Sequence, residues 1–573
     1  MWRARPNTNI HYELFTPHTD AMPTLQLKPD AWWELGKEYP EKEVVHAIVG
    51  MARFGARIGF GGSREGQHIS KNLATADELP DILNEDIQEQ KRNDRLIAYR
   101  SHRAIPKCFY SSPLGLVDKP NGKKRRIHHL SHPVGASIND GIAKRFGEIS
   151  YTTVGEVVAA ILELGVETVM LKRDFADAFR QVPVCPQDTP LLGFSFQGHF
   201  YAERFLPFGL RTAPYLFNLF AEVFHWALER RIQAISPTAK VLHYLDDFIV
   251  LLPPGSRWEP AAGVFQETAD EVGLKIKEQK NEEGTLVSFG GLLIDTRRMI
   301  IRLPPEKKTK GLALVSKYEN AESVSLFDLQ QLTGFLNFIT AVVPLGRAFL
   351  RRLYNLQLFF PAARFALRRI SAEAQRDLSW WRNLLSSTGD IERVFMPQAR
   401  KNFAMWTDAA GLKGLGGYFI ANPDKCGTAA HHPGLIQPEE AFMVALPRHI
   451  DQRQEHINTK EMRAVEQGIL RWRHIWRGAR VSLYIDNRAV VHGIANQSIR
   501  GNTMQVLRRC LLVASRSDIE LVPAWIPTGE NELADALSRF NKVKITDLAP
   551  QLLPLFNHLS HGFLTLGVRE CPE

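Results

Sequence analysis

The sequence predicts a multidomain protein of the α+β class, and three observations lead to this prediction. The chain has 573 residues, too many for one hydrophobic core, so about three or four folded units are expected. From residue 105 to residue 300, short β-branched runs alternate with helical patterns, as in mixed folds. Residues 304–395 then show helical periodicity alone, and strand patterns return from residue 401.

The composition limits the classes of function to consider. Apolar residues make up 44% and charged residues 23% of the chain, as in ordinary globular proteins. The net charge of +9 is compatible with a nucleic-acid partner, although charge alone leaves presence and absence of such a partner equally open. The five cysteines are widely separated and odd in number, which indicates neither a disulfide framework nor a paired-cysteine zinc site.

The chain shows no secretory signal pattern and no apolar run of membrane-spanning length. We therefore expect an intracellular protein, in the nucleus or the cytoplasm, that is neither secreted nor associated with a membrane. Residues 1–95 combine Trp32 and Trp33 with a glycine-punctuated stretch at 54–62 and a polar helical pattern. This composition predicts an N-terminal accessory region.

The remaining elements follow in order along the chain. Leu332, Leu336 and Ile339 recur at helical spacing, which predicts a helical module over residues 304–395. Its arginines have the pattern of a solvated face, and a helix along a nucleic-acid backbone would have the same pattern. A second α/β unit is predicted from strand-like and helical segments, which are Phe403–Trp406, Gly411–Tyr418, residues 459–476 and Val481–Ile485.

Two adjacent acids interrupt the strand-like run Val241–Leu252. Burying Asp246 and Asp247 in hydrocarbon would cost several kcal/mol each, so they must lie at an exposed tip or be neutralised by cations. A hairpin with both acids at its turn satisfies these conditions. Taken alone, this dipeptide is more typical of a solvated turn.

A third acid changes this interpretation. Asp174 ends another apolar run, Val169–Asp174, and is followed by Phe175–Pro183. Acids from separate strands that converge at one end of a sheet can hold two divalent ions about 4 Å apart. One ion activates an attacking oxygen and the other a leaving oxygen, which is the chemistry of nucleotidyl transfer. Carboxylate ligands favour Mg²⁺ or Mn²⁺ for this purpose.

In order and spacing, these segments resemble the palm motifs of reverse transcriptases. Tyr244–Asp247 resembles the family's Tyr-x-Asp-Asp box, and Asp174 resembles its first metal-binding aspartate. The resemblance implies that Asp174, Asp246 and Asp247 ligate two Mg²⁺ or Mn²⁺ ions, with Asp247 the less critical. It also implies that Tyr244 contributes to substrate binding.

Phe179 lies five residues beyond Asp174, where the family has a bulky aromatic that clashes with a ribose 2′-hydroxyl. The resemblance implies selection of deoxynucleotides. On residue type alone, a core phenylalanine is an equally good interpretation. The segment Leu206–Phe217 resembles the family's template- and nucleotide-contacting turn and helix. Phe208 and Gly209 would contact substrate there, because glycine permits close backbone approach.

The basic segment Lys119–Ile127 resembles the fingers hairpin of the same family. The resemblance implies that Lys119 and Arg125 clamp the incoming triphosphate, whereas a basic turn taken alone is more typical of a solvated loop. Further along the chain, Lys280 and Phe289–Gly291 resemble the family's motif lysine and its primer-grip turn.

Four acids in the C-terminal part follow the Asp, Glu, Asp, Asp order of RNase H-like domains. They are Asp408, Glu461, Asp486 and Asp535. Each by itself is more typical of a helix cap or a surface position. Together they imply a site with two further metal ions that activates water against the RNA strand of a hybrid. A histidine found before the last aspartate in some RNase H enzymes is missing here.

The overall resemblance is closest to DIRS-type retrotransposon polyproteins. It implies a right-hand polymerase of fingers, palm and helical thumb, followed by an α/β RNase H-like domain. It also implies RNA-directed DNA polymerase and ribonuclease H activities, acting on an RNA template, a DNA primer, an RNA/DNA hybrid and deoxynucleoside triphosphates. The expected parts are an accessory region (1–95), fingers and palm (96–303), thumb and connection (304–395), an RNase H-like domain (396–545) and a tail (546–573).

Two other functions fit parts of this pattern. A decayed or domesticated copy would be a catalytically idle nucleic-acid-binding scaffold, but decay tends to remove palm acids early and none is lost. A DNA-templated or primer-independent polymerase would share the palm motifs, but it would have little use for a nuclease that removes RNA from hybrids. We also find no constellation typical of a tyrosine recombinase, and we therefore expect a stand-alone, processed or truncated element.

Overall fold

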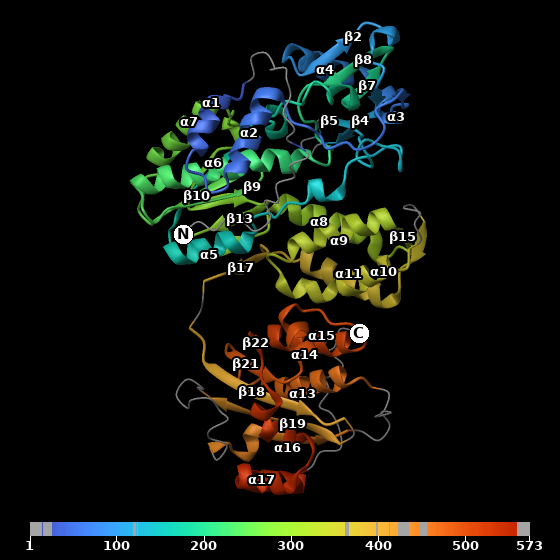
Figure 1. Ribbon diagram of the computed structural model, residues 1–573. Helices are drawn as coiled ribbons and strands as arrows, with labels where there is room; N and C mark the ends of the chain where they lie inside the picture. The colour runs from blue at the N-terminus through green and yellow to red at the C-terminus, as the bar shows by residue number, and fades with distance from the viewer. Residues whose placement is uncertain are drawn as a thin grey trace. The chain divides into compact units, whose positions relative to one another are not determined.

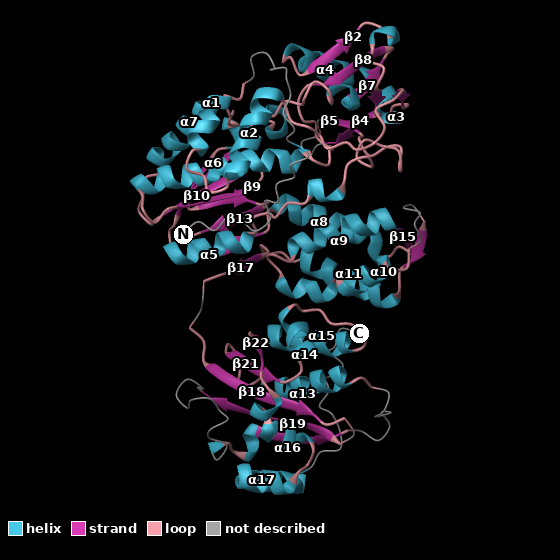
Figure 2. Ribbon diagram, viewed as in Figure 1, coloured by secondary structure: helices cyan, strands magenta, loops and turns pink. Residues whose placement is uncertain are grey.

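The computed structural model describes residues 14, 26–118, 122, 124–360, 366–396, 399–411, 413–421, 435–446 and 455–558. The chain forms two compact units, Met1–Ile301 and Arg302–Glu573. Both units combine helices with strands (Figures 1 and 2), as the α+β prediction requires. Within the described residues, no helix has the length and apolarity needed to cross a membrane.

An antiparallel sheet in the N-terminal unit carries the first group of acids. Its strands lie in the order β11 (Glu282–Gly284), β6 (Val169–Asp174), β10 (Asp247–Leu252) and β9 (Lys240–Tyr244). The predicted hairpin over residues 241–252 is confirmed as β9 and β10. The helices packed around this sheet are α1 (Pro29–Gly36), α2 (Lys42–Phe54), α5 (Val154–Leu164), α6 (Ala213–Ile235) and α7 (Glu259–Val272).

The core of this unit forms between the sheet and α6. Four rings, those of Phe175, Phe224, Phe248 and Phe265, have centroids 5.3 to 6.0 Å apart. Helix α6 has a proline in its first turn and is apolar around most of its circumference, because other elements surround it.

The N-terminal segment shares this core and is not packed as a separate body. Trp32 of α1 lies edge-on to Phe220 with ring centroids 5.1 Å apart, and Tyr39 lies edge-on to Trp226 at 5.6 Å. No sequence pattern indicated this packing, because the partners of these rings lie on α6, almost 190 residues further along the chain. The described part of the accessory region therefore stabilises the sheet that carries the acids.

A second sheet in the N-terminal unit lies beside a basic hairpin. The sheet has the order β1 (Gln67–Ile69), β3 (Phe109–Ser111), β7 (Gly193–Phe196), β8 (His199–Glu203) and β2 (Leu96–Tyr99). The hairpin pairs β4 (Leu114–Asp118) with β5 (Lys124–His128), as predicted. The remaining elements are α3 (Ala74–Glu78), α4 (Pro80–Arg92), β12 (Leu286–Phe289), β13 (Leu292–Asp295) and β14 (Ile300–Arg302).

The C-terminal unit begins with the predicted helical module. Leu332, Leu336 and Ile339 are all buried, which confirms the helical spacing. Ser325 caps the N-terminus of their helix by accepting a hydrogen bond from the backbone of Asp328 at 3.1 Å. The helices are α8 (Pro305–Glu319), α9 (Leu326–Ile339), α10 (Arg351–Gln357) and α11 (Ala372–Leu385), with the short strands β15 (Ser323–Ser325), β16 (Leu367–Arg369) and β17 (Glu392–Val394).

A mixed sheet follows, with helices on both faces (Figure 1). The strand order is β20 (Ala441–Ala445), β19 (Gly414–Ala421), β18 (Asn402–Ala409), β21 (Arg480–Ile485) and β22 (Glu520–Trp525), with β18, β21 and β22 parallel. Helices α13 (Ile457–Trp472), α14 (Arg488–Ala495) and α15 (Thr503–Arg516) lie on one face, and α16 (Glu532–Ser538) and α17 (Lys542–Leu548) on the other.

Alternating residues of β18 explain why both faces are covered. Phe403 packs toward Trp476 beyond α13, whereas Ala404 and Trp406 belong to the core beneath α16 and α17. This second core includes Ala549 and Leu552, so the described chain after residue 545 packs on the domain instead of leaving it as a tail.

Candidate active sites

The three acids predicted in the N-terminal unit lie together at one end of its antiparallel sheet. Asp174 is the last residue of β6 and is the cross-strand partner of Asp247, the first residue of β10. Leu245 at the hairpin tip has a φ of +55°, a left-handed conformation that forms the tight turn before Asp246. The backbone carbonyl of Asp246 accepts a hydrogen bond from the N–H of Phe175 at 3.2 Å.

Two lysines neutralise part of this acidic cluster. Lys280 Nζ lies 2.7 Å from Asp174 Oδ2, and Lys172 Nζ lies 3.7 Å from Asp247 Oδ1. Lys172 also donates to Glu282 Oε1 at 3.3 Å. The sequence analysis named Lys280 and missed Lys172. The strand pattern could have indicated Lys172. Residues two apart in a strand face the same side of the sheet, and Lys172 precedes Asp174 by two residues.

Two of these acids, Asp246 and Asp247, have raised pKa values. Burial raises the pKa of Asp246, and the neighbouring Asp174 raises it further. Burial also raises the pKa of Asp247 to about 6, where Lys172 acts against the shift and Asp174 adds to it. Among the described residues, Asp247 Oδ1 is buried and accepts no hydrogen bond. Carboxylate oxygens whose negative charge is only partly compensated fit Mg²⁺ or Mn²⁺, so the residues present suit such ions.

Side chains from three other predicted motifs gather on one surface. The rings of Phe179 and Phe208 have centroids 5.3 Å apart, and the guanidinium carbon of Arg125 lies 5.7 Å from the centroid of Phe208. Phe208 and Arg125 are exposed, whereas Phe179 is half-buried at the edge of the core. One part of the Phe179 ring therefore packs against the core, and the other part faces this surface.

The remaining predicted contact residues have the following positions. Gly209 has a φ of +93°, and a Cβ there would lie 3.2 Å from the carbonyl oxygen of His128. Tyr244 is 40% exposed and stacks on Tyr151 with ring centroids 4.7 Å apart. Lys119 lies outside the described residues.

A buried network of ion pairs joins Arg126 of the basic hairpin to Glu203, Asp86 and Arg180. The sequence analysis did not predict it. Arg126 Nη1 lies 3.1 Å from Glu203 Oε1 and its Nε lies 2.6 Å from Asp86 Oδ2. Arg180 Nη2 lies 3.1 Å from the same Glu203 oxygen. Burial alone would raise the pKa of Glu203, but Arg180 and Arg126 lower it to about 2. Burial also lowers the pKa of His128 to about 4.

The second acidic cluster lies in the C-terminal unit. Asp408 is near the end of β18, Glu461 is in the first turns of α13, and Asp486 follows β21. One carboxylate oxygen from each of these three residues lies within 4.8 Å of the others. The parallel pairing of β18 with β21 brings the two aspartates to the same sheet edge. The structure thus gathers three of the four acids predicted here.

Burial and the neighbouring carboxylates raise the pKa values of two acids of this cluster, Asp408 and Glu461. Burial raises the pKa of Asp408 to about 6, and Asp486 and Asp535 add to the shift. Burial, Asp408 and Asp486 raise the pKa of Glu461 well above its usual range. Among the described residues, the buried oxygen Oε2 of Glu461 has no hydrogen-bond partner. An orphaned buried oxygen among acids again fits a divalent cation.

Asp535 lies at the margin of this second cluster. Its Oδ1 is 2.6 Å from Arg539 Nε, and Ser538 of the same helix donates a hydrogen bond to Asp408 Oδ2. Helix α16 approaches so closely because β19 has glycine at position 416, where a Cβ would lie 2.3 Å from the backbone nitrogen of Ser538. The glycine-rich stretch thus allows the helix that carries Asp535 to lie over β18 and β19.

The raised pKa of Asp408 predicts an effect on stability in the absence of metal. A folded-state pKa of about 6 means that the folded protein binds more protons than the unfolded chain between about pH 4 and pH 6. The free energy of unfolding therefore falls as the pH rises through this interval. Asp408→Asn removes the buried charge and is expected to raise the free energy of unfolding by about 3 kcal/mol above pH 6.

This gain should shrink to about 0.5 kcal/mol at pH 4, where Asp408 is protonated in the folded protein and about half protonated in the unfolded chain. Urea unfolding in EDTA at pH 4 and pH 7.5 measures it. Asp547→Asn, at an exposed position of α17, is the control and should change the free energy by less than about 0.5 kcal/mol. An equal effect of Asp408→Asn at both pH values would contradict the argument.

The segment that carries the first acidic cluster is similar to known proteins. Residues 118–310, about a third of the chain, match the family model for reverse transcriptase (RNA-dependent DNA polymerase). This match defines residues 118–310 as a reverse transcriptase domain. It contains Asp174, Asp246, Asp247 and Lys280. Reverse transcriptases use divalent metal ions, which agrees with the donors gathered at this site.

The relatives of this domain are viral polymerase proteins. The chain is 23% identical over 253 residues to the Gag-Pro-Pol polyprotein of Human T-cell leukemia virus 2, covering 43% of this chain and 16% of the polyprotein. It is 27% identical over 184 residues to Protein P of Duck hepatitis B virus, covering 31% of this chain and 22% of that protein. The chain thus spans less than a quarter of either relative's length.

One solved structure among those that match is a foamy viral protease–reverse transcriptase in complex with double-stranded DNA. It shares 15% sequence identity with this chain, covers 91% of this chain and 84% of its own, and superposes with a TM-score of 0.44.

Proposed function

We propose that the protein is an RNA-directed DNA polymerase whose active site is formed by Asp174, Asp246 and Asp247. The observation that supports this most is the convergence of these three acids at one sheet end, inside the segment that matches the reverse transcriptase model. Two divalent ions bound there would activate the attacking and leaving oxygens and neutralise the charge of the triphosphate. Until then, Lys172 and Lys280 partly neutralise the carboxylates of Asp247 and Asp174.

The surrounding residues take substrate roles in this proposal. Arg125 and Lys119 contact the triphosphate of an incoming deoxynucleotide, because they belong to the basic hairpin. Phe208, Gly209 and Tyr244 line the path of template and primer. An RNA template with a DNA primer is the substrate pair, and the hybrid is the product.

We further propose that residues 396–545 form an RNase H-like domain that cleaves the RNA strand of the hybrid. Asp408, Glu461 and Asp486, together with Asp535 at their margin, hold the metal ions in this proposal. Residues 304–395 serve as thumb and connection. The proposed origin is a retrotransposon of the DIRS type, on the strength of the sequence resemblance.

The experiment that tests the polymerase is extension of a DNA primer on a homopolymeric RNA template with Mg²⁺ or Mn²⁺. Wild-type protein should extend the primer, and the Asp246→Asn variant should not. Tight binding of the hybrid without extension by either protein would reject the enzyme. That result would favour the catalytically idle scaffold instead.

Phe179→Ala is expected to raise ribonucleotide incorporation relative to deoxynucleotide incorporation at least about tenfold, because a clash with one hydroxyl is worth more than about 1.4 kcal/mol. Single-nucleotide extension with matched ribonucleotide and deoxynucleotide triphosphates measures the ratio. An unchanged ratio together with reduced thermal stability would assign Phe179 to the core alone.

Glu461→Gln is expected to slow cleavage of the RNA strand about a hundredfold, because it removes one negative ligand from the second cluster. Primer extension on the same template should remain at the wild-type rate. Cleavage of a labelled RNA/DNA hybrid measures the nuclease rate, and a gel extension assay measures the polymerase rate. Loss of both activities would show that the two clusters are not independent sites.

A further inference from the structure

A third group of potential metal ligands lies apart from both acidic clusters. Glu222 and His225 are three residues apart on α6 and therefore lie on one face of that helix. His243 reaches the same place from β9, and all three side chains are buried. One ligand atom from each residue lies within 4.8 Å of the other two.

The separations bring three potential ligand atoms close to one point. His225 Nδ1 lies 2.9 Å from His243 Nδ1, and the opposite nitrogen of the same His243 ring, Nε2, lies 3.7 Å from Glu222 Oε1. One ligand atom from each residue lies within 4.8 Å of the other two, whereas ligands about 2.1 Å from a tetrahedral zinc ion lie roughly 3.4 Å apart. An ion bound here would take one nitrogen from each histidine and one oxygen from Glu222, and would draw these atoms closer together.

The surroundings orient the ligands. The ring of Phe248 stacks on that of His243, with centroids 4.9 Å apart and planes at 14°. Thr152 donates a hydrogen bond to the backbone carbonyl of His243, which fixes β9 at this residue. Asn218, one helical turn before Glu222, lies 3.4 Å from both Glu222 Oε1 and His243 Nε2. Such outer contacts commonly fix the orientation of metal-binding side chains.

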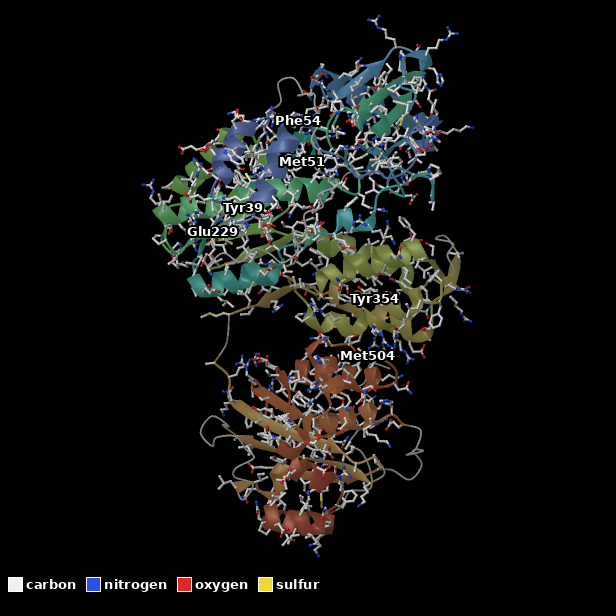
Figure 3. The ribbon with its side chains drawn as sticks, viewed as in Figure 1. Tyr39, Met51, Phe54, Glu229, Tyr354 and Met504 are labelled. Carbon is white, nitrogen blue, oxygen red and sulfur yellow. The ribbon has the colours of Figure 1, made fainter. Side chains whose placement is uncertain are left out.

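The group is also accessible from outside. A cavity of about 660 Å³ has Glu222 and His225 in its wall, together with Glu229, Lys240 and Val241. Glu229, labelled in Figure 3, lies one helical turn beyond His225 on α6. The cavity gives an ion a path of entry and gives a water molecule room as the fourth ligand.

We infer that Glu222, His225 and His243 bind one transition-metal ion, with Zn²⁺ as the natural occupant. Imidazole donors select zinc and its neighbours over Mg²⁺, which prefers oxygen ligands only. This site is therefore chemically distinct from the two carboxylate clusters. The ion ties α6 to β9 at His243. The next four residues, Tyr244–Asp247, end β9, form the turn and begin β10. The inference does not depend on polymerase activity.

Titration of the chelator-treated full-length protein with Co²⁺ tests the inference. One equivalent should produce the strong visible absorption of a four-coordinate cobalt ion, and Zn²⁺ should abolish it. His225→Gln should weaken Co²⁺ binding at least a hundredfold. His199→Gln, at an exposed histidine of β8, is the matched control and should bind as the wild type does. Asp246→Asn should also retain the band, since it alters only a carboxylate cluster.

Two results would overturn the inference. One is the absence of the band in wild-type protein, and the other is an equal band in His225→Gln and the wild type. If His225→Gln fails to fold by circular dichroism, Glu222→Gln takes its place and the same loss is expected. As a second measurement, Zn²⁺ in the presence of excess Mg²⁺ should raise the melting temperature of the wild type and not that of the folded ligand variant.

Discussion

Asp246→Asn is expected to lower the rate of primer extension on an RNA template by about three orders of magnitude, or about 4 kcal/mol in the activation free energy. The substitution keeps the shape of the side chain and removes one negative charge from the cluster with Asp174 and Asp247. An amide oxygen is a much weaker ligand for a divalent ion than a carboxylate. The loss should therefore appear in the rate of catalysis rather than in the binding of the hybrid.

Single-turnover extension over a range of Mg²⁺ concentrations measures this effect, and fluorescence anisotropy measures hybrid binding. Asp270→Asn, at an exposed position of α7, is the matched control and should leave both quantities unchanged. If Asp246→Asn weakened hybrid binding by the same factor as the rate, Asp246 would serve in binding and not in catalysis.

Glu203→Gln is expected to lower the free energy of unfolding by about 3 to 5 kcal/mol. The fully buried carboxylate faces two guanidinium groups, those of Arg126 and Arg180, and its removal leaves both cations without their shared counter-charge. Because the folded-state pKa of Glu203 is about 2, its contribution is fully present above about pH 4.5 and is lost as the pH falls toward 2.

Denaturant unfolding at pH 7 measures the loss. Glu271→Gln is the matched control, because its ion pair with Arg231 is about 38% exposed on both sides and should contribute less than about 1 kcal/mol. A loss of that small size for Glu203→Gln would mean that the buried network contributes no more than a surface ion pair.

Local patterns predicted much of the first site. The hairpin over residues 241–252 followed from an apolar run interrupted by two acids, and its cross-strand partner followed from a second such run ending at Asp174. Both patterns result from the burial of neighbouring strands in one sheet. Such burial requires runs of consecutive apolar residues, which can be seen in the sequence. The helical spacing of residues 332–339 was confirmed for the same reason.

Contacts between distant segments could not be predicted in this way. Glu203 is one acid among many in the sequence, and its role depends on Arg126 and Arg180 reaching it from other elements. Trp32 and Tyr39 gave no sign that α6 is their partner. Glu222, His225 and His243 have an ordinary helical and strand spacing, and only the packing of α6 on β9 brings them together. The roles of the individual acids in catalysis remain predictions.

The alternation of β5 has a consequence for how this gene can change by small insertions and deletions. Arg125 faces outward beside Phe208, and its neighbour Arg126 faces inward to Glu203. Extra residues at the tip of the hairpin leave this alternation intact, so variation in loop length there is tolerable. Loss of a single codon within β5 would exchange the two arginines' faces, removing the proposed substrate contact of Arg125 and the core ion pair of Arg126 at once. Natural length variants of this hairpin should therefore fall between the strands and not within them.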